Sequence, residues 1–121
     1  MNIAEFEALV ASALDGMPPE FARAMDNVEV VVEIWPTAEE LSAGNVEPGS
    51  TLLGLYHGVP KTKRGSYIGA LPDKIIIFAG PILTMSGFDP AAVKREVRNT
   101  VLHEVGHHFG LNEKEIAKAL S

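Results

Sequence analysis

The chain has no cysteine among its 121 residues. Disulfide bonds, cysteine-based zinc ribbons and catalytic thiolates are therefore excluded. Long apolar runs are missing too, since no stretch approaches the roughly 20 apolar residues that a membrane-spanning helix needs. The first ten residues, MNIAEFEALV, carry two glutamates where a secretory signal would carry positive charge. Together these absences predict a cytoplasmic protein without a membrane partner.

Positive charge is scarce. Ten Lys and Arg residues stand against 16 Asp and Glu residues, which gives a formal net charge of −6. Proteins that bind nucleic acid or anionic membranes usually carry a basic surface, so we expect no nucleic-acid partner. A basic cluster, Lys61, Lys63 and Arg64, lies in a stretch bounded by glycine and proline, and we interpret it as a solvated loop.

What is present is the composition of an ordinary globular domain, with 46% hydrophobic and 21% charged residues. The length fits one domain, so we expect residues 1–121 to form a single unit. Hydrophobic spacing, β-branched runs and capping residues predict the order of elements. The predicted helices are 2–15, a short one after Pro18, single turns at 37–42 and 81–85, a long one from Pro90 to Phe109, and 113–120; the predicted strands are 28–35, 51–56 and 74–79.

These elements predict an α+β fold class. We expect a three- to four-stranded sheet packed on N-terminal helices and on the long C-terminal helix. The apolar run at 74–79 is typical of a strand buried on both faces. Trp35 and the phenylalanines are expected in the core.

Three of the four histidines lie in the stretch TVLHEVGHHFGLNE, residues 100–113. On the predicted helix His103 and His107 lie one turn apart, about 40° apart around the axis, so both imidazoles can bind one metal ion. Glu104 lies about 100° further round and can act on a water without binding the metal. This H-E-x-x-H pattern joins two metal ligands to a general base. The valines at 97, 101 and 105 fall well away from the histidines and should face the core.

Catalytic zinc takes three protein ligands and leaves one position open. Gly110 can turn the chain back after the helix, which makes Glu113 the candidate third ligand. The metal lowers the pKa of a water toward ~7, and Glu104 takes its proton as the water attacks a carbonyl. One zinc ion is therefore the expected cofactor. Asn112 or Glu113 can instead cap the last helix.

The neighbouring polar residues receive simpler interpretations. His108 points toward the valine face and is expected to pack there or to support a ligand. His57 is remote in sequence, and we expect no metal role for it. Glu96 and Thr100 share the face of the ligands one to two turns earlier, and we expect both to be solvated.

The stretch HEVGHHFGLNE resembles the extended H-E-x-x-H-x-x-G motif of zincin metallopeptidases. Most of the chain is similar to a small bacterial family of minimal zincins, and this likeness is carried by the segments LLGLYHGVP, RGSY, LPDKIIIFAGPI and VRNTVLHEVGHHFG. The resemblance implies a compact zincin-like domain with a small sheet over the metal helix. It also implies zinc held by His103, His107 and Glu113, with Glu104 as the base.

The resemblance makes a zinc-dependent peptidase the predicted function. Larger zincins with the extended motif carry a methionine turn after a third ligand that is more often histidine, whereas no methionine follows Glu113. We therefore expect short peptides or unstructured protein segments as substrates. An extended peptide can join an edge strand beside the cleft, and residues 51–56 and 74–79 are the candidates for that strand.

Two other functions remain open at this point. In a metal-binding protein with a structural or vestigial site, zinc would raise stability without turnover. Small bacterial metal-dependent ribonucleases also carry two histidines four residues apart on a helix and a third ligand past a glycine. They typically lack the glutamate beside the first histidine, so Glu104 and the negative net charge count against that function.

Overall fold

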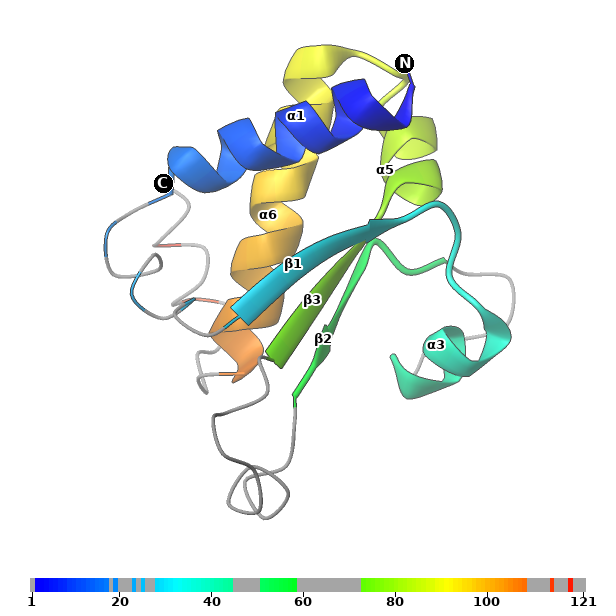
Figure 1. Cartoon of the computed structure of the whole chain (residues 1–121), viewed down its shortest axis with the longest axis vertical. Helices are drawn as coiled ribbons and strands as arrows, with labels where there is room; N and C mark the ends of the chain where they lie inside the picture. Colours follow the sequence, from blue (N-terminus) through cyan, green and yellow to red (C-terminus); the bar gives the residue numbers. More distant parts are fainter. Residues whose placement is uncertain are drawn as a thin grey trace.

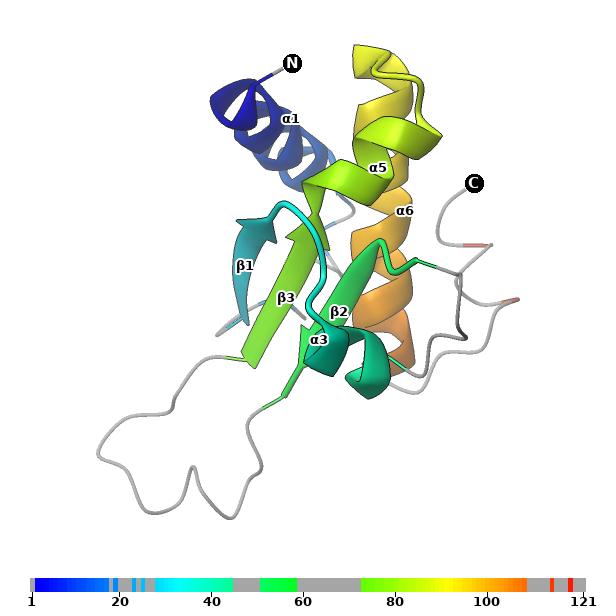
Figure 2. The same ribbon diagram turned by 90° about the vertical axis from the view of Figure 1, so that its right-hand side faces the viewer.

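The structure, a computed structural model, describes residues 2–17, 19, 23, 25, 28–44, 51–58, 73–108, 114 and 118, and of residues 107 and 108 it describes the backbone only. In this part of the chain a small sheet packs against helices, which confirms the predicted α+β fold class (Figures 1 and 2). The elements in chain order are α1 (Ile3–Asp15), β1 (Val28–Glu33), α3 (Ala38–Ala43), β2 (Gly54–His57), β3 (Asp73–Phe78), α5 (Ala79–Met85) and α6 (Pro90–His108).

The sheet has three strands in the order β1-β3-β2. β3 is the central strand, parallel to β1 and antiparallel to β2. Its apolar run is buried on both faces, as predicted, because Ile75 and Ile77 face one side while Ile76 and Phe78 face the other. Among the described strands, β1 and β2 therefore form the two edges.

The strand ends differ slightly from the prediction. β1 ends at Glu33, two residues early, because the chain leaves the ladder ahead of Pro36. β2 begins at Gly54 rather than Thr51. The third strand ends at Phe78, since Ala79 already begins α5 (Figure 2).

Three of the described helices begin at a polar capping side chain. Asn2 accepts the N–H of Glu5 at 2.8 Å at the start of α1. Thr37 and Glu40 form a capping box at α3. Asp89 accepts the N–H of Ala92 at 3.0 Å, which confirms the predicted start of α6. The predicted short helix after Pro18, the end of the long helix near Gly110 and the helix at 113–120 fall largely or wholly outside the described residues.

One hydrophobic core joins α1, α6 and the sheet. α1 crosses α6 on one side of the sheet (Figure 1) and buries Phe6 and Val10 there. The valine face of α6 meets them, as the spacing predicted, and its four valines are at most 1% exposed. These valines are Val93, Val97, Val101 and Val105. Burial of a side chain of this size contributes about 1.5–3 kcal/mol, so this face fixes the orientation of the whole helix.

The expectation that Trp35 lies in the core was wrong, since its side chain is 58% exposed. It follows the end of β1, where the chain turns toward α3, and its ring covers the backbone of Gly80. A Cβ atom at Gly80 would come within 2.5 Å of that ring. The same expectation for the phenylalanines was right for Phe6 and Phe78, which are fully buried, and wrong for Phe88, which is 56% exposed.

α3 lies against the other face of the sheet, near β2. A cavity of about 440 Å³ lies between α3 and the sheet. Residues of α3 line it on one side, and Leu55, His57, Lys74 and Ile76 of the sheet line it on the other. Glu33 and Glu40 meet at this cavity and share a hydrogen bond. Burial raises the pKa of Glu33, and the hydrogen bond and charge of Glu40 raise it further, whereas Lys74 opposes this. The backbone N–H of Thr37 lowers the pKa of Glu40.

Glu33→Gln is therefore expected to raise the melting temperature slightly at pH 7. A carboxyl whose folded-state pKa is raised opposes folding once it ionises, above its ordinary value of 4.5. The gain is on the order of one degree, because charge effects at partly exposed sites are small. Thermal denaturation at pH 7 and at pH 3.5 measures it, and the gain should vanish at the lower pH. Glu40→Gln is the matched control and should lower the melting temperature at pH 7. The pKa of Glu40 is lowered in the folded state, so its charged form stabilises the fold at that pH.

Candidate functional site

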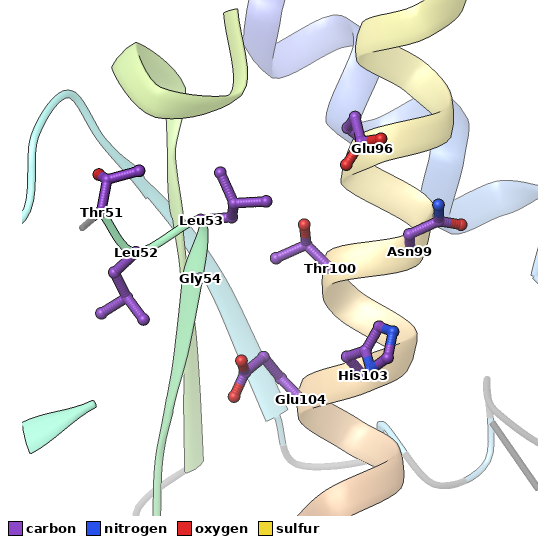
Figure 3. A pocket seen from close by; sticks show the side chains of 9 residues that line it. All are labelled: Thr51, Leu52, Leu53, Gly54, Glu96, Asn99, Thr100, His103 and Glu104. Atoms are coloured by element: carbon purple, nitrogen blue, oxygen red, sulfur yellow. The ribbon is translucent and has the colours of Figure 1, made fainter. Parts of the chain in front are cut away.

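A cavity of about 310 Å³ opens between α6 and the segment that leads into β2 (Figure 3). One wall is formed by residues 51–54, and the other by the polar face of α6. The α6 residues are Glu96, Asn99, Thr100, His103 and Glu104. The structure thus places one predicted metal ligand and the predicted base in the same cavity.

Glu104 reaches across this cavity to the sheet. Its carboxylate oxygen Oε2 accepts the backbone N–H of Tyr56 at 3.2 Å. Figure 3 shows the Glu104 side chain extending from α6 toward β2, whereas the His103 side chain does not extend toward β2. The two neighbouring side chains therefore line one cavity but point in different directions.

The close approach of β2 to α6 depends on Gly54. A Cβ atom there would overlap the methyl carbon Cγ2 of Thr100 and would lie 3.2 Å from the carbonyl oxygen of Ile76. Thr100 is only 6% exposed, so the expectation that it is solvated was wrong. Glu96 is partly exposed and lines the cavity. A lone glycine in an apolar strand pattern is the sequence signal for such a contact.

Sequence reasoning also missed Tyr56 and Asp73. The hydroxyl of Tyr56 donates to Oδ2 of Asp73 at 2.6 Å. Asp73 begins β3 and is 6% exposed, so this hydrogen bond ties the end of β2 to the buried centre of the sheet. Tyr56 therefore makes two hydrogen bonds: its backbone N–H donates to Glu104, and its side-chain hydroxyl donates to Asp73.

The metal site predicted from the sequence has one described side chain, that of His103. His107 follows it one turn later on the unbroken backbone of α6. The side chain of His107 and the whole of Glu113 lie outside the described residues, and so does the side chain of His108. Among the side chains that are described, no group of three His, Asp or Glu residues can hold a metal ion. His57 lies on the α3 face of the sheet, across from His103.

The donor set suits zinc. Two imidazoles one turn apart on a straight helix can share one ion, and a carboxylate completes the three protein ligands of a catalytic site. Glu104, the predicted base, extends from α6 toward the opposite wall of the cavity.

No helix within the described ranges has the length and apolar character needed to cross a membrane.

Known proteins resemble this chain in sequence and in shape, although a search of curated proteins finds no match. A solved structure, described as a conserved hypothetical protein from Thermus thermophilus, is similar in both respects. It is 28% identical, the match covers 89% of this chain and 94% of that one, and the TM-score is 0.56. The sequence pattern of the family described as zincin-like metallopeptidase matches residues 25–120. The chain therefore belongs to the zincin-like metallopeptidase family.

Proposed function

We propose that the chain is a zinc-dependent peptidase that hydrolyses peptide bonds of short peptides or unstructured protein segments. The observation that carries the proposal is the cavity between α6 and β2, in which His103 and Glu104 lie beside an edge strand. Membership of the zincin-like metallopeptidase family supports the same chemistry.

His103, His107 and Glu113 would hold the ion. Zinc supplies an acidified water and a positive charge that polarises the substrate carbonyl. Glu104 takes the proton of the attacking water and returns it to the leaving amine. Its carboxylate already lies in the cavity, at the wall opposite the helix.

β2 is the strand beside which the peptide lies. Of the two candidate strands, β3 is central in the sheet and has both edges paired, whereas β2 pairs only with β3 among the described strands. β2 also forms one wall of the cavity through Gly54. An extended peptide at this edge has its scissile bond over the polar face of α6.

The test has two steps. Metal analysis of the chain purified without added metal should find one zinc ion per chain, and a library of unstructured peptides should then contain substrates that are cleaved until a chelator is added. His103→Ala should lose both zinc and cleavage. Asn99→Ala changes a side chain one turn earlier on the same helix face and should still bind zinc.

The alternatives correspond to other results. Zinc that raises the melting temperature while no peptide is cleaved would indicate a structural or vestigial site. Cleavage of RNA, unchanged by Glu104→Gln, would indicate the ribonuclease. Absence of zinc binding by the wild type would refute all three functions.

A further inference from the structure

The backbone N–H of Tyr56 points away from the sheet. Phe78 donates its N–H to the carbonyl of Leu53 at 3.0 Å, which fixes where the antiparallel ladder of β2 and β3 forms its hydrogen bonds. Along such a strand the backbone N–H groups point alternately toward the partner strand and away from it. The N–H groups of Leu55 and His57 therefore point toward β3, and the N–H of Tyr56 points toward the outer edge of β2. The outer edge is the side that an added peptide strand would use.

In the structure this outward N–H donates to the carboxylate of Glu104, 48 residues later in the chain. The site is partly buried, and a hydrogen bond to a charged acceptor is stronger there than in water. Two further contacts fix its geometry. The Tyr56 hydroxyl is anchored on Asp73 at 2.6 Å, and Gly54 lets β2 lie against Thr100.

We propose that the Tyr56 N–H is the resting position of the Glu104 carboxylate, and that a peptide displaces the carboxylate when it joins β2. The inference rests on the proposed function, which supplies the peptide. An extended peptide needs the outward N–H of Tyr56 for one of its own carbonyls. The carboxylate and the peptide carbonyl compete for this one donor, so binding of the peptide releases the base toward the scissile bond.

Tyr56 is thus a positioning residue, which acts on the base through its backbone. Asp73 holds the tyrosine ring through the hydroxyl, while the ladder with β3 sets the direction of the N–H. The consequence is that the base is held at the strand edge without a peptide and becomes free only with one. Removing the side chain of Glu104 should therefore tighten the binding of a peptide.

The resting contact is tested by amide hydrogen exchange, measured by NMR on the ¹⁵N-labelled chain. Glu104→Ala should speed exchange of the Tyr56 N–H by about tenfold, the value of one hydrogen bond to a charged group. The N–H groups of Leu55 and His57, which face β3, should exchange at unchanged rates. Glu96→Ala removes the same charge from the same cavity wall and should leave Tyr56 unchanged. Equal exchange of Tyr56 in the wild type and in Glu104→Ala would overturn the proposal.

The competition is tested with two variants that carry no charge at position 104. The probe is an acetylated and amidated peptide of six alternating valine and threonine residues, which favour an extended chain. Zinc-loaded Glu104→Ala should bind it about three- to tenfold more tightly than Glu104→Gln, whose amide oxygen still accepts the Tyr56 N–H. Equal or weaker binding by Glu104→Ala, or no binding by either variant, would contradict the competition.

The two measurements separate this inference from the proposed function. If the zinc-loaded wild type cleaves no peptide, the peptidase fails, but exchange of the Tyr56 N–H still reports the resting contact. If peptides are cleaved and exchange is insensitive to Glu104, the peptidase stands and the resting contact is refuted.

Discussion

Glu104→Gln is expected to lower kcat for peptide cleavage by about 10²–10⁴-fold, the usual contribution of a general base. The glutamine side chain has the same shape and can still accept the N–H of Tyr56, so the cavity should keep its form. It cannot take a proton from water. Zinc should stay bound at one ion per chain, because Glu104 lies beside the ligands and extends toward β2. The measurements are kcat on the best library substrate and the zinc content of the same sample.

The matched control is Glu39→Gln. It makes the same chemical change on α3, on the opposite face of the sheet, and should leave kcat and zinc content unchanged. Cleavage by Glu104→Gln at the rate of the wild type would assign the base to another group. Loss of zinc from Glu104→Gln would instead make Glu104 a ligand.

The sequence predicted the parts of the molecule that depend on local spacing. α6 and its start at Asp89 followed from a capping residue and a proline, both of which act within one turn. The burial of its valine face followed from the helical period alone. The same period placed Glu104 about 100° round the helix from His103. In the structure the two side chains line one cavity, and that of Glu104 extends toward β2 (Figure 3).

The sequence did not predict the wall opposite that helix. Strand order is not a local property, so nothing in the spacing indicated that β2 would be the edge that faces α6. Tyr56 forms hydrogen bonds to Asp73, 17 positions later in the chain, and to Glu104, 48 positions later. No sequence pattern indicates either of these long-range contacts. Thr100 was interpreted as solvated because its helix face is polar, but it is covered by a strand whose glycine leaves room for it. Trp35 was misplaced for a related reason, since a strand that ends two residues early turns its next side chains outward.

Gly54→Ala is expected to destabilise the fold by about 3 kcal/mol, the upper end of the usual cost of overpacking. The added methyl would overlap Cγ2 of Thr100 and lie against the carbonyl of Ile76, and neither neighbour is free to move, because both lie within the packed interior. Gly54 does not have a positive φ, so the cost is steric rather than conformational. Denaturant unfolding measures the loss. Gly16→Ala is the control, because a Cβ atom there meets only ordinary contacts at 3.7 Å.

The double variant Gly54→Ala/Thr100→Ser identifies the contact. Thr100→Ser alone removes the methyl that the new alanine would overlap, and it should cost about 1 kcal/mol as a small cavity. In the double variant the alanine methyl occupies that space, so the two losses should not add and most of the stability should return. If the losses of stability of the two single variants simply add in the double variant, the overlap between residues 54 and 100 is not the cause of the destabilisation. Because β2 carries the N–H that holds Glu104, Gly54→Ala should also speed amide exchange at Tyr56, and Thr100→Ser should restore it.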